Sequence, residues 1–333
     1  MKIKKHKINI NIILIIISII ILLIAFYITS IIPIEMCSGN DCPTQTPSSG
    51  VIPAQDKSPG LTIAYIGDAE PESSSDVKEL TKDLNQVIPQ SPTGRVDAIF
   101  FMGDMTKISL TIKAVESSDV NNVPVYFVIG NHEAQSSDET AIIRGRYSAS
   151  IFLLNPGPPG TDKTTYSMNV GNMHVINMNE YWNGATDDSY LKYSSTDGGY
   201  IPDTLYDWMS ADLSKTSDWK IVVGHDPLYP KSKHVGNSLD ANKANRDKLQ
   251  ALFESKNVDL FIGGHTHNAG VQNVRGVYHA NTGVIGPGAD GSGDGVASIS
   301  YTYTTANSLI VTIKQEDPTW STPRTLITKT ISR

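Results

Sequence analysis

Side chains that can bind a metal ion or transfer a proton recur just after short apolar segments of this sequence. Asn131 and His132 follow the apolar run 123–129 and the glycine at 130. The amide oxygen of Asn131 suits a divalent metal, and the imidazole of His132 gains or loses a proton near neutral pH. The other instances, each behind a glycine, are Asp68, Asp104, His225 and the pair His265 and His267.

These side chains offer only oxygen and nitrogen ligands, which suit zinc, manganese or iron. Two such ions close together polarise a phosphoryl group, generate hydroxide near neutral pH and hold an in-line displacement. The carboxylate of Asp104 can bridge two ions. The alternation in Gly264-His265-Thr266-His267 predicts an extended segment with both imidazoles on one side.

Taken singly, each of these residues has an ordinary structural explanation. A lone Asp after a strand is usually a turn or helix-cap residue, and a lone His there is usually structural. His174 and His279 lie within apolar runs and are interpreted as structural. Six ligand candidates at equivalent positions, however, predict one shared metal site.

Alternating strands and helices are predicted to bring these residues together. Strands are expected over 61–66, 96–102, 123–129, 221–223 and 259–262, and helices over 76–88, 108–120, 205–213 and 242–255. This order favours an α/β fold with parallel strands and covering helices, in which ligands gather beyond the carboxyl ends of the strands. Antiparallel strands are expected at 165–170, 174–179 and in the tail at 297–303, 308–315 and 324–331.

The first 34 residues predict a membrane anchor. Residues 8–34 carry no charge and follow Lys2, Lys4, Lys5 and Lys7. This run is long enough to cross a bilayer, and the lysines predict that the remainder lies outside the cytoplasm. A cleaved signal peptide is the alternative, although its apolar region is usually shorter.

A tether and one large domain are expected after the anchor. Residues 35–60 are rich in Pro and Ser, which predicts a linker, and 61–333 form the predicted domain. Cys37 and Cys42 either close a small loop or remain unpaired in this tether. The net charge of −7 argues against a nucleic-acid partner held by phosphate contacts.

The ordered series of motifs resembles the calcineurin-like metallophosphoesterase superfamily. The blocks are Gly67-Asp68, Gly103-Asp104, Gly130-Asn131-His132-Glu133, Gly224-His225 and Gly264-His265-Thr266-His267. Residues 165–180, 219–229 and 264–268 are most similar to purple acid phosphatase-like members. The resemblance implies a four-layer αββα sandwich.

The same resemblance implies two metal positions and roles for individual residues. Asp68, Asp104 and His267 would hold the first ion, and Asp104, Asn131, His225 and His265 the second. A metal-bridging hydroxide would attack phosphorus. His132 would stabilise the transferring phosphoryl group or protonate the leaving oxygen, and His234 would contact the substrate.

Two residues depart from the family pattern. Glu70 stands where the family has His or Gly, and Lys107 stands where it has Asp or Tyr. Glu70 is a possible substitute ligand, whereas a protonated Lys cannot bind a metal. One hypothesis pairs Glu70 with Lys107 beside the first metal; the alternative leaves Lys107 pointing into solvent.

The sequence therefore predicts a membrane-anchored, extracytoplasmic phosphatase that uses two divalent or trivalent ions (Fe, Zn or Mn). Its expected substrates are small phosphomonoesters, as in acid phosphatases. One alternative is a phosphodiesterase or nucleotidase of the same superfamily, with the aromatic segment 180–203 either stacking a base or only covering the domain. Another is a degenerate metal-binding surface module with little activity.

Overall fold

A computed structural model describes residues 60–146, 154–161, 163–186, 199–215, 218–231, 233–289, 297–316, 320 and 323–332. The predicted anchor, the linker with its two cysteines and most of the segment 180–203 lie outside these residues. The described residues belong to one compact unit, Ala54–Arg333. Among them, no helix has the length and apolar character needed to cross a bilayer.

The first sheet contains six strands in the order β13-β12-β11-β1-β2-β3. Three of them are parallel, as the alternation of strands and helices predicts: β1 (Thr62–Ile66), β2 (Ala98–Phe101) and β3 (Val125–Phe127). The tail adds three antiparallel strands to the free edge of β1: β11 (Ser298–Thr304), β12 (Ser308–Gln315) and β13 (Arg324–Ser332).

The second sheet contains seven strands in the order β4-β5-β6-β7-β8-β10-β9. Its parallel centre consists of β6 (Met173–Asn177), β7 (Trp219–Val223), β8 (Leu260–Gly263) and β10 (Val277–Thr282). Its antiparallel edges are β4 (Asn155–Pro156) with β5 (Tyr166–Val170), and β9 (Ala269–Val274).

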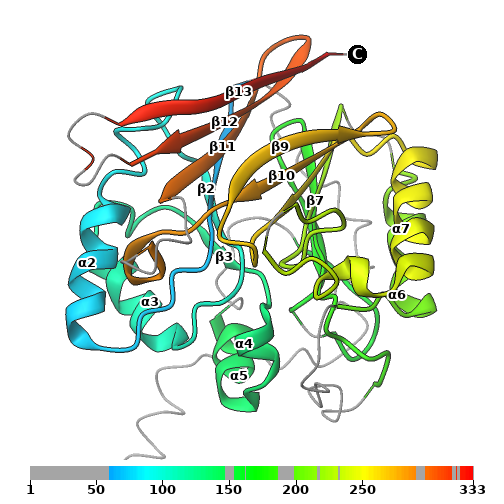
Figure 1. Cartoon of the computed structure of the whole chain (residues 1–333), viewed down its shortest axis with the longest axis horizontal. Helices are drawn as coiled ribbons and strands as arrows, with labels where there is room; N and C mark the ends of the chain where they lie inside the picture. The colour runs from blue at the N-terminus through cyan, green and yellow to red at the C-terminus, as the bar shows by residue number, and fades with distance from the viewer. Residues whose placement is uncertain are drawn as a thin grey trace, which may run out of the picture. The chain divides into compact units, whose positions relative to one another are not determined.

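Helices cover the two outer faces of this pair of sheets (Figure 1). On one side lie α2 (Ser74–Leu84) and α3 (Ile108–Glu116), and on the other α6 (Asp203–Asp212) and α7 (Lys243–Ser255). The apolar stripe of α7, formed by Leu249, Leu252 and Phe253, packs in a cluster with Val222 and Phe261 of the second sheet. The expected α/β class with covering helices is confirmed.

The inner faces of the sheets are joined by apolar packing and by buried hydrogen bonds. The amide nitrogen of Asn177 in β6 donates to the carbonyl of Phe127 in β3 at 3.0 Å. The hydroxyl of Thr304 in β11 donates to the Asn172 side-chain oxygen at 2.8 Å. Because such bonds satisfy polar groups in a dry interface, they hold the sheets in one register. The strand ends that carry the candidate ligands are therefore fixed relative to one another.

Several elements differ from the sequence prediction. The short strand β4, which pairs with β5, is not among the predicted strands. A helix α5 (Ser137–Arg146) and the strand β9 were not predicted. β9 has no regular apolar alternation that would predict a strand. Its extended conformation depends on pairing with β10.

Candidate metal centre

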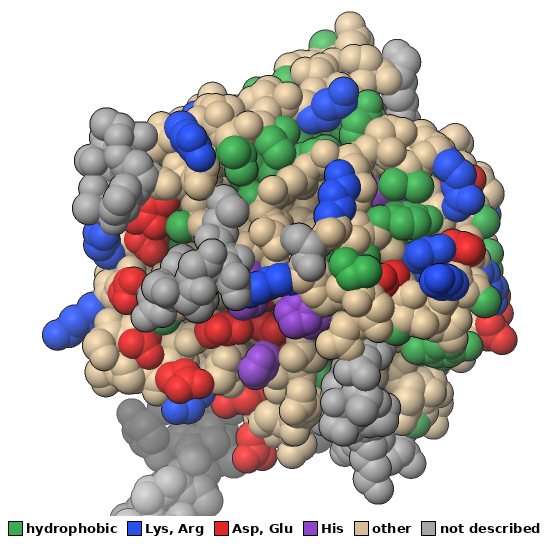
Figure 2. Space-filling view, in the orientation of Figure 1, with side chains coloured by type: hydrophobic (Ala, Val, Ile, Leu, Met, Phe, Trp, Pro, Cys, Tyr) green, Lys and Arg blue, Asp and Glu red, His purple; other side chains and the backbone are tan. Residues whose placement is uncertain are grey.

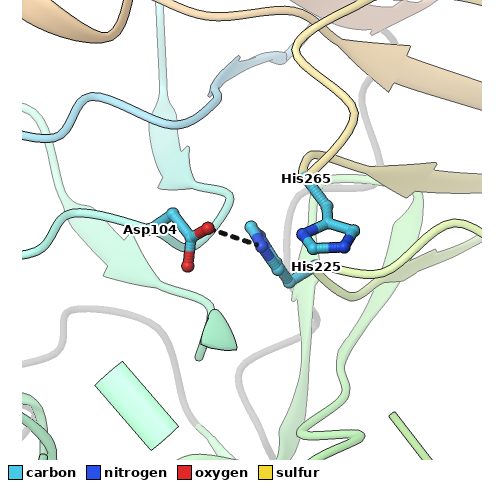
Figure 3. Close-up of side chains that lie close together, drawn as sticks. All are labelled: Asp104, His225 and His265. Carbon is cyan, nitrogen blue, oxygen red and sulfur yellow. Dashed lines mark ion pairs between the residues drawn. The ribbon is translucent and has the colours of Figure 1, made fainter. Parts of the chain in front are cut away.

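The candidate ligands meet at the carboxyl ends of the parallel strands. One ligand atom from each of Asp104, His225 and His265 lies within 4.8 Å of the others (Figure 3). A second group with the same spacing joins Asp104 to Glu70 and His132. Asp104 belongs to both groups, as expected for a carboxylate that bridges two positions.

The side chain of His225 is oriented by the backbone. Its Nδ1 lies 2.7 Å from the carbonyl oxygen of Met102, so Nδ1–H donates to that carbonyl. Its Nε2 then faces Asp104 Oδ2 at 3.2 Å and Asn131 Oδ1 at 3.2 Å. Two ligands about 2.1 Å from one ion lie roughly 3–3.5 Å apart, so these atoms have the spacing of a shared metal position.

His265 is oriented in the opposite sense. Its Nε2 lies 3.1 Å from the carbonyl oxygen of Asn237, which fixes the proton on Nε2 and leaves Nδ1 with the lone pair that a metal could use. Its backbone N–H donates to both carboxylate oxygens of Asp68, at 3.0 and 3.1 Å. The segment that supplies one metal position is thereby tied to a ligand of the other.

Asp68 and His267, the residues expected at the first metal position, lie close together. Asp68 Oδ1 lies 3.6 Å from His267 Nε2, and Glu70 Oε1 lies 3.8 Å from the same nitrogen. Burial and then the charge on Lys233 lower the pKa of His267 to about 4. The imidazole is therefore neutral at pH 7 and has a lone pair for a metal.

The electrostatics of the cluster favour a bound cation. Burial raises the pKa of Asp68 well above its usual value, and the charges of Asp104 and Glu70 raise it further against the opposing effect of His225. Burial alone would lower the pKa of His225, but the charge and hydrogen bond of Asp104 outweigh it and hold that pKa well above its usual range. The same negative field attracts metal ions, and the donor set fits them.

Backbone conformations that L-residues rarely adopt gather at this site. Positive φ angles occur at Asp68 (39°), Glu70 (40°), Asp104 (51°), His234 (56°), His265 (63°) and His267 (55°). The expected extended Gly-His-Thr-His segment is therefore wrong: the chain bends after β8, and the bends, not strand alternation, place the two imidazoles. Each left-handed residue costs on the order of 1–2 kcal/mol, a cost that proteins retain mainly at functional sites.

Two glycines allow the strand ends to approach one another. A Cβ on Gly103, whose φ is 94°, would lie 2.4 Å from His225 Nδ1. A Cβ on Gly130 would lie 2.3 Å from the backbone nitrogen of Asp104. No side chain fits at either position without moving a ligand.

His132 and His234 lie at the edge of the cluster. His132 is the second residue of the short helix α4 (Asn131–Ala134). Its backbone N–H donates to Asp104 Oδ1 at 3.0 Å, and its side chain is 46% exposed. Its Nε2 is 3.9 Å from Asp104 Oδ2. The ring of His234 lies 4.1 Å from that of His265. Figure 2 shows histidine side chains beside acidic ones on this face.

Lys107 is placed away from the hypothesised ion pair. Its ammonium donates to the carbonyl oxygen of Glu72 at 3.0 Å, and no ion pair between Lys107 and Glu70 is present among the described residues. Glu70 instead lies beside His267. The backbone of the loop after β1 therefore provides the partner of Lys107.

The structure adds three carboxyl groups whose roles were not predicted. Glu133 accepts from the backbone nitrogens of Asp104 (2.9 Å), Met105 (2.9 Å) and Gly130 (3.0 Å). It thus fixes two ligand-bearing turns with one side chain. The position of Glu133 directly after Asn131-His132 was the one feature of the sequence that could have indicated this role. Its hydrogen-bond partners, however, are set by the tertiary fold.

Glu180 and Asp226 contact the histidine-bearing segments of the second sheet. Glu180 Oε1 accepts from the backbone nitrogens of His225 (2.5 Å) and Asp226 (2.6 Å). Burial, and then the charge of Asp226, raises the pKa of Glu180 to about 8. Asp226 Oδ1 accepts from the Tyr181 hydroxyl at 2.6 Å and lies 3.6 Å from His265 Nε2. Such partners of metal-binding histidines fix ring orientation.

Comparison with known proteins agrees with this geometry. The family model described as "Calcineurin-like phosphoesterase" matches residues 61–269. A manganese-dependent ADP-ribose/CDP-alcohol diphosphatase of Bos taurus is 23% identical over 74% of this chain and 75% of its own length. The Mus musculus protein of the same name is 27% identical over 47% of this chain and 45% of its own length.

Two solved structures share the fold. The chain titled "GAP50 the anchor in the inner membrane complex of Plasmodium" aligns with a TM-score of 0.55 and 14% identity, covering 82% of this chain and 89% of its own. The structure titled "Structure of PhoD" aligns with a TM-score of 0.52 and 12% identity, covering 82% and 72%. These similarities concern the arrangement of sheets and helices alone.

Proposed function

Because the chain belongs to the calcineurin-like phosphoesterase family, we propose that it is a metal-dependent phosphohydrolase with a dinuclear centre. The observation that carries this proposal is the convergence of six donor side chains at the carboxyl ends of strands from both sheets: Asp68, Asp104, Asn131, His225, His265 and His267. Two cations held there supply Lewis-acid chemistry toward phosphoryl oxygens.

The ligands divide between two positions in this proposal. Asp68 and His267 hold one ion, Asn131, His225 and His265 hold the other, and Asp104 contacts both. Glu70 is a further carboxylate for the first position, since it lies 3.8 Å from His267. Manganese, zinc and iron all suit such a set, and the similarity to manganese-dependent relatives makes manganese the first ion to test.

His132 and His234 act on the substrate in this proposal. The exposed imidazole of His132 stands beside Asp104, where it can donate a proton or hydrogen bond to the leaving oxygen. His234 packs over His265 and contacts the phosphoryl group from the opposite side. Asp104 fixes the backbone of His132, so the position of the acid is set by a metal ligand.

The diphosphate linkage of a nucleotide-linked small molecule is our preferred substrate. The support is the similarity to two proteins named ADP-ribose/CDP-alcohol diphosphatases. Phosphomonoesters are the second candidate. Their dianionic terminal phosphate suits the positive charge of Lys233, which is the second cause, after burial, of the lowered pKa of His267.

A substrate comparison tests the proposal. Metal-stripped protein is supplied with Mn²⁺, Zn²⁺ or Fe²⁺ and assayed with an aryl phosphate, an aryl phosphodiester and ADP-ribose. We expect metal-dependent turnover, fastest on the diphosphate. Preference for the aryl phosphate would establish the monoesterase. Turnover with none of these substrates and metals would favour the surface-binding module.

We also propose that the domain is anchored in a membrane with the site outside the cytoplasm. The support is the uncharged run 8–34 behind four lysines. Protease treatment of intact cells is expected to release the domain. Recovery of the whole chain in the soluble fraction would contradict the anchor.

A further inference from the structure

The carboxyl end of β10 carries none of the six candidate ligands, yet it contacts the backbone that carries two of them. Asn281 and Thr282 are the last two residues of this strand. The side-chain amide of Asn281 donates to the hydroxyl oxygen of Thr266 at 2.9 Å. Thr266 lies between His265 and His267 in the sequence. A strand that supplies no donor atom to the centre is therefore bonded to the segment that supplies two imidazoles.

Thr266 is held at its hydroxyl, its carbonyl and its backbone nitrogen. It is 1% exposed, and its carbonyl accepts from the side-chain nitrogen of Asn268 at 2.7 Å. Its backbone N–H donates to the carbonyl of Gly264 at 2.6 Å. His265 and His267, on either side, both have positive φ. Because L-residues adopt such conformations only at a cost, the bonds to the residue between them keep both bends in place.

The ring of His267 depends on these bonds more than the rings of the other two ligand histidines do. The ring of His225 is oriented by the carbonyl of Met102, and that of His265 by the carbonyl of Asn237. Within the described part of the chain, no backbone carbonyl accepts a hydrogen bond from the ring of His267, whose Nε2 faces two carboxylates of the centre. The position of this ring is therefore set by its backbone.

The same strand end packs against the turn that carries Asp68. A Cβ on Gly67 would lie 2.2 Å from the carbonyl oxygen of Gly283 and 2.4 Å from the hydroxyl oxygen of Thr282. This contact also joins the two sheets, because the carbonyl of Thr282 accepts from the hydroxyl of Ser298 in β11, the strand beside β1. The end of β10 thus fixes the Asp68 turn of the first sheet against the segment that follows β8 in the second.

We propose that the end of β10, through Asn281, is the positioning element of the first metal position. It holds His267 Nε2 at its 3.6 Å separation from Asp68 Oδ1, close to the spacing of about 3–3.5 Å between two ligands of one ion. The proposal rests on the proposed phosphohydrolase function, which assigns an ion to this pair. Asn281 acts only through Thr266 and contacts neither ion nor substrate.

Asn281→Ala removes the amide that donates to Thr266 and leaves all six candidate ligands in place. In a stepwise Mn²⁺ titration of metal-stripped protein, we expect one site to be weakened about 10–100-fold, as for the lost partner of a metal ligand, and the other to be nearly unchanged. Electron paramagnetic resonance is then expected to show isolated Mn²⁺ at metal concentrations where the wild type shows a coupled pair. Unchanged affinities, or equal weakening of both sites, would overturn the proposal.

Three further variants separate positioning from general stability. Thr266→Ser keeps an acceptor for Asn281 and is expected to bind both ions as the wild type does, whereas Thr266→Val removes the acceptor and is expected to match Asn281→Ala. Gln272→Ala is the matched control, because this amide on neighbouring β9 also donates to another element, the carbonyl of Tyr229 at 2.7 Å. Urea unfolding measures the stability of each variant. A Gln272→Ala protein with one site weakened as strongly would reduce the effect to general destabilisation and refute the proposal.

A metal-free measurement keeps this test apart from the test of the proposed function. In metal-stripped protein, the imidazole resonance of His267, assigned by nuclear magnetic resonance with His267→Gln, is expected to shift in Asn281→Ala and to stay unchanged in Gln272→Ala. A shift in a protein that binds no Mn²⁺ would refute the metal-dependent phosphohydrolase alone. A His267 resonance that does not respond to Asn281→Ala would refute the positioning role, whether or not the ions bind.

Discussion

His132 is the residue whose chemistry is most separable from metal binding. Its side chain is exposed and lies 3.9 Å from Asp104, and in our proposal it holds no ion. We expect His132→Gln to lower kcat by about 10²–10⁴-fold, the usual contribution of a general acid, while metal content is unchanged. Turnover and metal analysis on the same sample check this. Loss of metal together with activity would make His132 a ligand.

Glu133 is predicted to act through the residues that it holds. Replacement by Gln puts an amide N–H against backbone N–H groups that the carboxylate now satisfies. A buried donor without a partner costs about 1–3 kcal/mol, and loss of a ligand-supporting contact typically weakens metal binding about 10–100-fold. Urea unfolding and Mn²⁺ titration measure the two effects, with the exposed Glu116→Gln as control. A variant with normal stability and metal affinity would remove Glu133 from the account.

His279 makes the stability of the protein depend on pH. Burial lowers its pKa to about 3, whereas the unfolded chain titrates near 6.5. Below about pH 6.5 the unfolded state binds a proton that the folded state does not, so stability present above that pH is lost as the pH falls. The slope is about 1.4 kcal/mol per pH unit for this group. Between pH 6 and pH 5, wild type is expected to lose more free energy of unfolding than His279→Gln, and equal losses would contradict this.

The turns after the strands determine the site at the scale of elements. Gly103 follows β2, and a Cβ there would strike His225 Nδ1, which is bonded to Met102. We expect Gly103→Ala to weaken Mn²⁺ binding by more than about tenfold, because His225 must turn. Gly94→Ala is a matched control: its φ is also positive, at 72°, but no atom lies within 4 Å of its Cβ. Metal titration of both variants separates the effect of the clash with His225 from the effect of backbone strain. Equal Mn²⁺ affinities of the two variants would show that metal binding does not require the close contact between Gly103 and His225.

The sequence predicted the strand ends well because each parallel strand is a short buried run followed by glycine. Parallel strands place such ends on one side of a sheet, so Asp68 and Asp104 could be grouped before any coordinates. His225 belongs to the second sheet, and its place beside them depends on how the two sheets pack. The bends at His265 and His267 could not be predicted, because alternation assumes an extended chain and both residues have positive φ. The roles of Glu133 and Asp226 depend on bonds between distant elements, for which the sequence carries no local pattern.

At the scale of the whole molecule, the candidate site is formed by residues from both sheets. The first sheet brings Asp68, Asp104 and Asn131, and the second brings the three histidines. Bonds such as Asn177 to Phe127 fix the sheets against each other, so the ligands need little rearrangement to bind a cation. Metal binding is therefore expected to stabilise the domain by linkage, by about 2.7 kcal/mol at a hundredfold excess over Kd.

A single titration tests the central claim most directly. Mn²⁺ is added to metal-stripped protein while bound metal and hydrolysis of ADP-ribose are followed together. We predict no turnover without metal, and activity that rises to a plateau as two ions bind per chain. The Asp104→Asn variant is expected to lose both metal binding and hydrolysis. Hydrolysis by the metal-free protein, or a chain that binds no ion at the plateau of activity, would contradict a metal-dependent site built from these six residues.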